Sequence, residues 1–253
     1  QMGDTKMAIT TNVEIKRLNQ TEIVLRMVGK TPLYFNSMSA KTKRDLLIGG
    51  GRKTSAEKQQ IKHNPEQEFK DSLYKKDYGE TLLCFPAPGI KQAMATAALE
   101  TEGVKKTTVN RLLFLPEEKV NIWGTPYLKM DIVRSADMNR TPDVRTRGYL
   151  PRWCAEVKLR FMTPALSTYS VMSLLSNAGD IVGIGDYRQE KGRGSYGCFD
   201  VFPNNHKDIP EWDNIVKESR DAQKHAMDNP MYADSETEEL MEILGIERQK
   251  RAA

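Results

Sequence analysis

The chain is poor in the residues that usually build disulfides, metal sites and catalytic centres. Its 253 residues include three cysteines and three histidines. The cysteines are odd in number, widely spread and without C-x-x-C spacing, which indicates a reducing compartment and predicts neither a disulfide framework nor a structural zinc site. The histidines form no recognisable pattern with a nucleophile. We therefore expect no catalytic residues, no metal and no cofactor.

Long apolar segments are missing as well. The densest run, residues 93–99, is far shorter than the roughly 20 residues of a membrane helix. The first residues lack the basic-then-apolar pattern of a secretion signal. With 39% hydrophobic and 28% charged residues, the composition is typical of a globular protein in water. We therefore expect no membrane partner and a cytoplasmic location.

Charge is distributed unevenly along the chain. Residues 204–253 hold 7 Lys or Arg and 12 Asp or Glu, a net charge of −5, whereas residues 1–203 carry +9. A basic body with an acidic tail favours a polyanionic partner, with the tail as a solvated or regulatory appendage. Charge alone leaves open the alternative of a surface that only maintains solubility.

Hydrophobic patterning predicts a mixed α+β fold. The clearest strand covers residues 152–162, where apolar and polar side chains alternate. Further strands are expected at residues 21–29, 81–85, 110–115, 119–123, 129–135, 180–185 and 197–202, and helices at 39–48, 65–76, 89–100, 167–178, 211–227 and 235–248. Ser39 and Ser167 are expected as N-caps, Gly179 as a helix stop, and Ser235 with Glu238 as a capping box.

The order of these elements contains β-α-β-β-α-β, which is typical of a ferredoxin-like or RNA-recognition-motif-like core. Residues 1–20 are expected to be disordered or tag-derived. Residues 21–203 are expected to form the RNA-recognition-motif-like core, with insertions near 49–64 and 134–152. Residues 204–253 are expected to form an acidic, helical C-terminal tail.

The stretch at residues 182–199 is the most distinctive part of the sequence. Residues 192–197 match G-x-G-x-x-G, but a dinucleotide-binding turn lies between a strand and a helix, and the flanking residues fit neither. What remains is a set of glycines, cations and tyrosines: Gly183, Gly185, Gly192, Gly194, Gly197, Arg188, Lys191, Arg193, Tyr187 and Tyr196. Glycines leave main-chain N–H groups accessible to phosphates, cations neutralise phosphates, and rings stack on unpaired bases. The alternative is an ordinary hairpin whose glycines serve its turns.

Two further basic clusters fit the same kind of partner. The first comprises Lys41, Lys43 and Arg44 in the helix expected at residues 39–48, followed by Arg52 and Lys53. The second lies on an expected extended arm and comprises Arg134, Arg140, Arg145, Arg147 and Arg152, with Tyr149 and Trp153 as candidate stacking groups. Arginine suits phosphate better than lysine does, because its planar guanidinium donates two hydrogen bonds to one phosphate. For each cluster taken alone, a solvated surface remains the alternative.

Two motifs resemble a known superfamily. The glycine-rich loop follows an expected helix and precedes an expected strand, and it resembles the C-terminal glycine-rich loop of the RAMP superfamily. That superfamily includes the CRISPR effector backbone subunits that coat guide RNA. Residues 26–44 (RMVGKTPLYFNSMSAKTKR) and 185–192 (GDYRQEKG) also resemble uncharacterised bacteriophage proteins, which we interpret as stand-alone relatives of those subunits. The resemblance spans roughly residues 20–203.

The resemblance implies an RNA-recognition-type core, an insertion that acts as a thumb, self-association along a nucleic acid strand, and a bacterial host cell as the location. It also implies that the loop glycines and their neighbouring cations contact nucleic acid. With the basic body, it favours a non-enzymatic protein that binds single-stranded RNA or DNA and assembles along the strand. Two alternatives stay open. One is a RAMP-type endoribonuclease, although no catalytic position is convincing, and the other is a phage decoy that interacts with a host CRISPR or other defence protein.

Overall fold

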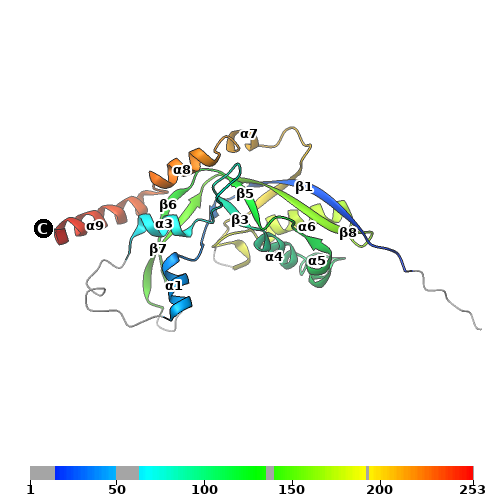
Figure 1. Cartoon of the computed structure of the whole chain (residues 1–253), viewed down its shortest axis with the longest axis horizontal. Helices are drawn as coiled ribbons and strands as arrows, with labels where there is room; N and C mark the ends of the chain where they lie inside the picture. The colour runs from blue at the N-terminus through cyan, green and yellow to red at the C-terminus, as the bar shows by residue number, and fades with distance from the viewer. Residues whose placement is uncertain (1–14, 50–62, 135–139, 192–193, 253) are drawn as a thin grey trace, which may run out of the picture.

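The computed structural model describes residues 15–49, 63–134, 140–191 and 194–252. The fold is α+β, and the molecule is elongated, with one antiparallel sheet towards each end (Figure 1). The larger sheet has the strand order β3-β5-β8-β1-β9, and β4 also pairs with β8. Its strands are β1 (Asn19–Gly29), β3 (Cys84–Pro86), β4 (Leu113–Phe114), β5 (Lys119–Trp123), β8 (Cys154–Thr163) and β9 (Phe199–Pro203). All of these pairings are antiparallel.

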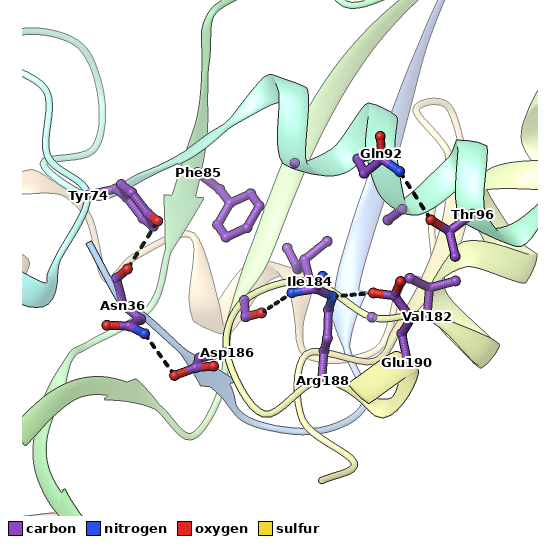
Figure 2. A pocket seen from close by; sticks show the side chains of 14 residues that line it. Asn36, Tyr74, Phe85, Gln92, Thr96, Val182, Ile184, Asp186, Arg188 and Glu190 are labelled. Atoms are coloured by element: carbon purple, nitrogen blue, oxygen red, sulfur yellow. Dashed lines mark hydrogen bonds and ion pairs between the residues drawn. The ribbon is translucent and has the colours of Figure 1, made fainter. Parts of the chain in front are cut away.

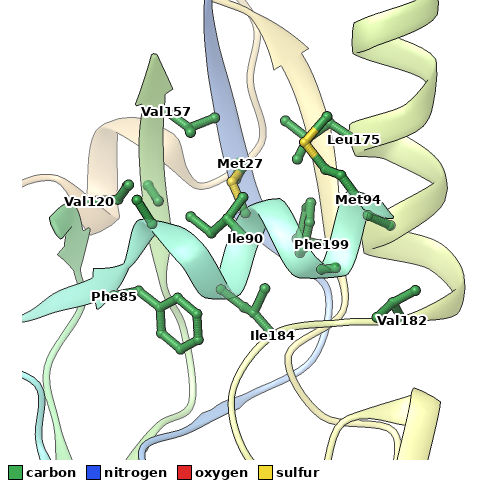
Figure 3. Packing of buried hydrophobic residues seen from close by; sticks show 14 of the residues in the cluster. Met27, Phe85, Ile90, Met94, Val120, Val157, Leu175, Val182, Ile184 and Phe199 are labelled. Atoms are coloured by element: carbon green, nitrogen blue, oxygen red, sulfur yellow. The ribbon is translucent and has the colours of Figure 1, made fainter. Parts of the chain in front are cut away.

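One face of the larger sheet is buried under two helices, α4 (Ala87–Ala97) and α6 (Thr168–Ile181). Along β8, apolar residues such as Val157 are fully buried and alternate with polar ones, as the sequence pattern predicts. Figure 3 shows Ile90 of α4 and Leu175 of α6 packed over this face. The helices therefore leave the opposite face of the sheet for the C-terminal segment and for solvent.

Two N-caps predicted from the sequence are confirmed. The hydroxyl of Ser39 accepts a hydrogen bond from the Thr42 N–H at 3.1 Å and begins α1 (Ala40–Ile48). The hydroxyl of Ser167 accepts from the Ser170 N–H at 3.0 Å and begins α6. Each satisfies a main-chain donor that the helix itself leaves unpaired.

The smaller sheet has the order β2-β7-β6. Its strands are β2 (Leu33–Tyr34), β6 (Tyr127–Arg134) and β7 (Pro142–Leu150), and α3 (Pro65–Ser72) packs on it. A Cβ atom at Gly148 in β7 would lie 2.2 Å from the side chain of Leu73. The close approach of the chain after α3 to this sheet therefore requires a glycine at this position.

The C-terminal segment packs on the body. Its helices are α7 (Trp212–Ile215), α8 (Arg220–Asp228) and α9 (Ser235–Ala252). The Leu128 N–H of β6 donates to the Met231 carbonyl at 2.8 Å, and the Ala233 N–H donates to the Leu128 carbonyl at 2.9 Å. The Met130 N–H donates to the Thr237 hydroxyl at 3.2 Å. These bonds cover part of the open edge of β6, which an exposed strand would otherwise offer to other chains.

Acidic residues of this segment also pair with basic residues of the body. The pairs are Arg152 with Glu211 and Glu218, Lys129 with Asp234, and Lys70 with Asp228. The acidic segment thus neutralises cations of its own chain, which differs from the solvated appendage expected from charge alone.

One of these contacts predicts a dependence of stability on pH. Arg248 of α9 donates two hydrogen bonds to Glu66 of α3, at 2.8 and 3.0 Å, which holds the pKa of Glu66 below its ordinary value of 4.5. A carboxylate with a lowered folded-state pKa adds stability above its unfolded pKa, and that stability is lost as the pH falls through the folded pKa.

We therefore expect the wild type to lose more free energy of unfolding than Arg248→Gln between about pH 5 and pH 3, measured by urea denaturation. The difference should stay below about 1 kcal/mol because the pair is exposed. Identical acid dependence in the two proteins would contradict this role of the pair.

Two predictions near residue 180 are wrong: the helix end at Gly179 and the strand at residues 180–185. Helix α6 continues to Ile181, so Gly179 does not end it. A Cβ atom at Gly179 would lie 2.1 Å from the Phe199 carbonyl oxygen, so the glycine allows α6 to approach β9. The strand expected at 180–185 is absent from these described residues, because α6 occupies its beginning and a turn follows.

Three other elements also differ from the sequence predictions. Residues 106–112 form helix α5 (Lys106–Leu112), and a strand remains only at β4, because a short apolar run fits either element. The helix expected at 211–227 is broken into α7 and α8. The cap of α9 is Asp234, whose carboxylate accepts from the Thr237 N–H at 3.0 Å, in place of Ser235.

In the described ranges, no helix combines the length and the apolar character that crossing a bilayer requires.

Candidate nucleic-acid groove

Asn36 lies in the walls of three cavities, and we call the surface around it the groove. The three are the aromatic cavity (about 250 Å³), the arginine cavity (about 460 Å³) and the lysine cavity (about 970 Å³). Asn36 follows β2. Its side-chain amide donates to the Asp186 carboxylate at 3.0 Å, and its main-chain carbonyl accepts from the Tyr74 hydroxyl at 3.3 Å. These bonds fix the position of Asn36 in the groove.

The lysine cavity gathers positive charge. Lys43, Lys75 and Lys119 line it. Lys75 donates to the Lys70 carbonyl at 2.6 Å, and Lys119 donates to the Lys75 carbonyl at 3.0 Å, contacts that do not neutralise the ammonium groups. The pKa of Lys75 is lowered, mainly by burial and further by the positive charges of Lys70 and Lys43, while Asp71 opposes the shift. A bound anion would relieve this repulsion.

Besides two carboxylates, Asp71 and Glu118, the lysine cavity offers apolar surface. Leu73, Tyr74, Pro86 and Pro88 line it. Helix α4 begins at the same wall, and its first turn has no side-chain cap. The positive end of the helix dipole therefore adds to the field of the lysines.

The arginine cavity lies between α3 and β7 and includes Arg145 and His63 among its lining residues. The two ring nitrogens of His63 lie 3.0 Å from Glu68 and 3.2 Å from Asp143. Both nitrogens are therefore engaged by carboxylates, which leaves neither oriented towards a substrate as a general base.

The loop glycines pack against the main chain of their own protein. A Cβ atom would lie 2.5 Å from the Tyr34 oxygen at Gly185, 2.1 Å from the Tyr187 oxygen at Gly194, and 1.8 Å from the Ile184 oxygen at Gly197. Gly183 has a φ of +75°, and a Cβ atom there would lie 2.9 Å from the Tyr196 carbonyl oxygen and 3.2 Å from the Gly197 carbonyl oxygen. The described glycines thus serve tight internal packing, which is the alternative that the sequence left open.

The loop tyrosines also contact the core. The ring of Tyr34, which is 1% exposed, lies edge-on to Tyr187, Tyr196 and Tyr149, with centroids 5.5, 4.8 and 5.1 Å away. This tyrosine cluster joins the glycine-rich loop to the smaller sheet. The three partner rings are only partly buried, so their outer edges remain accessible.

Arg147 does not belong to an exposed arm. It is 8% exposed, its guanidinium lies 4.6 Å from the ring centroid of Tyr187, and it pairs with Asp131 at 3.3 Å and Asp186 at 3.0 Å. Its position on β7 places it under the loop, where it neutralises two partly buried carboxylates. The sequence pattern could not show this, because Arg145 and Arg147 lie two residues apart on one strand and both line the arginine cavity, yet only Arg145 is exposed.

The remaining predicted site residues are distributed as follows. Lys43 and Arg44 are exposed on α1, Arg134 is exposed at the end of β6, Arg140 is exposed shortly before β7, and Lys191 is exposed within the glycine-rich stretch. Arg152 is exposed but bound by Glu211 and Glu218, and Arg188 lines the aromatic cavity and pairs with Glu190 at 2.8 Å. Arg52, Lys53, Gly192, Arg193 and the side chain of Lys41 lie outside the described residues.

Sequence reasoning missed the residues that define the groove: Asn36, Tyr74, Lys75 and Lys119. Lys75 falls within the helix predicted over residues 65–76, but α3 ends at Ser72. Lys119 begins β5, far along the chain from Lys75. No local pattern could have joined them, since only the tertiary fold brings them to one cavity.

The outward face of the larger sheet is a weaker candidate. RNA-recognition motifs stack bases on aromatic side chains of their two central strands. Here the outward positions of β1 and β8 carry ion pairs, such as Glu22 with Arg160 at 2.6 Å and Arg26 with Glu156 at 3.6 Å. Trp212 of α7 covers part of this face, and Arg26 lies 4.7 Å from the centroid of its ring.

In the part of the chain that the structure describes, no group of three or more His, Cys, Asp and Glu side chains is arranged to hold a metal ion. No protein-family model matches the chain, and a comparison with curated proteins finds no significant match. The functional conclusion therefore rests on the geometry of the groove.

Proposed function

We propose that the protein binds single-stranded nucleic acid, RNA or DNA, in the groove around Asn36 without cutting it. The observation that carries the proposal is the lysine cavity. It combines three cations, Lys43, Lys75 and Lys119, which outnumber the carboxylates Asp71 and Glu118, with the apolar surface of Tyr74 and two prolines, and it shares Asn36 and Tyr74 with the aromatic cavity. Cations that neutralise phosphates beside surfaces that accept bases are the usual elements of a single-strand site.

The topology supports a ferredoxin-like core for this protein. In chain order, β1, α4, β5, β8, α6 and β9 give β-α-β-β-α-β, and in the sheet β8 lies between β1 and β5 while β1 lies between β8 and β9. This is a pair of interleaved split βαβ units. We propose that the chain is a RAMP-like protein on this basis, with β2, α1, α3 and the β6–β7 hairpin as insertions. Assembly along a strand stays a prediction of that resemblance.

The geometry of His63, the histidine among the described residues of the groove, does not favour the endoribonuclease. That reaction would need a general base with a free nitrogen or oxygen near the strand. His63 is the histidine that lines the groove, and Glu68 and Asp143 hold both of its ring nitrogens.

The proposal is tested by fluorescence anisotropy with labelled single-stranded DNA, single-stranded RNA and a duplex. We expect a single strand to bind more tightly than the duplex, and Lys75→Glu combined with Lys119→Glu to weaken binding at least about 100-fold. Two hydrogen bonds to charged groups contribute about 1.5–3 kcal/mol each. The matched control is Lys105→Glu, a reversal at an exposed lysine next to α5 and outside the three cavities.

Melting temperatures of all variants serve to separate lost binding from lost folding. Equal affinities of the double variant and the control would overturn the assignment of the groove. Absence of binding to any strand by the folded wild type would overturn the proposed function itself.

A further inference from the structure

The aromatic cavity has the size and walls of a site for one planar ring system. It lies between α4 and the loop at residues 182–190 (Figure 2). The rings of Phe85 and Tyr74 form one side, with centroids 5.9 Å apart and planes at 77°. A Cβ atom at Gly89 would lie 2.7 Å from the Phe85 ring, so this glycine lets the ring lie against α4. Its volume of about 250 Å³ is below the roughly 300–1,000 Å³ of sites for larger ligands.

Charged groups at the cavity are already neutralised. Asp186 pairs with Arg147 at 3.0 Å, and Glu190 pairs with Arg188 at 2.8 Å. An uncompensated phosphate or metal ion would find no excess of opposite charge here. The cavity therefore suits a neutral ligand, in contrast to the lysine cavity.

Neutral polar groups lie at the rim. The amide of Gln92 is exposed on α4, and its long contact of 3.4 Å with the Thr96 hydroxyl does not occupy it fully. A glutamine side chain offers a donor and an acceptor side by side, and it pairs in this way with N6 and N7 of adenine. Gln92 can therefore contact the edge of a base that stacks on the Tyr74 ring and meets the Phe85 ring edge-on.

We infer that the aromatic cavity receives one unpaired base of the bound strand and that Gln92 favours adenine there. The inference rests on the proposed function and deepens it. Tyr74 and Asn36 line both the aromatic and the lysine cavities. A strand that passes Tyr74 thus places a base in one cavity while its phosphates lie among the lysines of the other. Because the two cavities differ in charge, backbone contacts and base contacts can be measured separately.

The experiment compares three labelled 12-mers: oligo(dA), oligo(dT) and an abasic phosphodiester of the same length. In the wild type, oligo(dA) should bind at least about 5-fold more tightly than the abasic strand, the lower end of the effect of one stacked base. Tyr74→Leu should reduce affinity for both base-bearing strands and leave the abasic strand unchanged. Gln92→Ala should remove the preference for oligo(dA) over oligo(dT), while Gln249→Ala, at an exposed glutamine of α9, should retain it.

Each other outcome overturns the inference in a distinguishable way. If all three strands bind the wild type equally, or if Tyr74→Leu and Gln92→Ala weaken the abasic strand as much as oligo(dA), the cavity is not a base site, although the proposed function stands. If oligo(dA) and oligo(dT) bind equally but better than the abasic strand, the preference assigned to Gln92 is wrong. If none of the strands binds, the proposed function fails together with the inference.

Discussion

Gly197→Ala is expected to lower the free energy of unfolding by about 3 kcal/mol or more, through backbone strain and a steric clash together. Gly197 has a φ of +69°, and an added Cβ atom would lie 1.8 Å from the Ile184 carbonyl oxygen. The main chain cannot yield easily, because the Ile184 N–H donates to the Gly197 carbonyl at 3.0 Å and the Gly197 N–H donates to Pro32 at 2.8 Å. Urea denaturation of the variant measures the loss.

Substitutions at two other glycines separate the contribution of backbone strain from that of the steric clash. Gly49 has a φ of +77° but nothing within 4 Å in the described structure, so Gly49→Ala should cost only about 1 kcal/mol from strain. Gly245 lies within α9 with nothing within 4 Å, so Gly245→Ala should raise stability by about 0.5–1 kcal/mol. If Gly197→Ala cost no more than Gly49→Ala, the close packing of the glycine-rich loop would be wrong.

Gln223→Leu is expected to destabilise the protein by about 3–5 kcal/mol, because it would leave four main-chain groups without partners. The side chain of Gln223 in α8 is 0% exposed. Its oxygen accepts from the N–H groups of Leu82 and Leu83 at 2.9 and 3.0 Å, and its amide donates to the carbonyls of Ile122 and Gly124 at 2.8 and 3.1 Å. One side chain from the C-terminal segment thus completes the hydrogen bonding around β3 and β5.

Urea denaturation of Gln223→Leu tests whether the C-terminal segment is part of the folded unit. Lys224→Leu, at the exposed neighbouring position, is the matched control and should change stability by less than about 0.5 kcal/mol. If both variants were equally stable, α8 would not hold the edge of the larger sheet, and the segment would be the appendage that its charge suggested.

The elements that could be predicted are those whose own residues show a strand or helix pattern. The alternation along β8 and the capping serines of α1 and α6 place strands and helices correctly. The strand predicted at residues 110–115 is wrong at its start, where α5 continues to Leu112, because a short apolar run fits a helix or a strand equally well. The break between α7 and α8 is also invisible locally, since Trp212 packs on the outward face of the sheet while Gln223 fills another position at its edge.

The candidate site was less predictable than the fold. A glycine that approaches a phosphate and a glycine that packs against a carbonyl are the same letter in a sequence, and Gly194 and Gly197 pack closely against carbonyl oxygens of their own chain. Arg145 and Arg147 look alike in the sequence, yet one is exposed and the other is buried between carboxylates. The lysine cavity depends on residues that only the tertiary fold brings together.

The most direct test of the central claim is the salt dependence of single-strand binding by the wild type and by Lys75→Gln combined with Lys119→Gln. If about 4–6 phosphates are contacted, the slope of log K against log salt should lie near −3 to −4, at about 0.7 for each phosphate. The double variant should have a slope flatter by about 1.4, and Lys105→Gln should leave the slope unchanged. A slope near zero in the wild type, or the same slope in the double variant and the wild type, would contradict a nucleic-acid groove at these lysines.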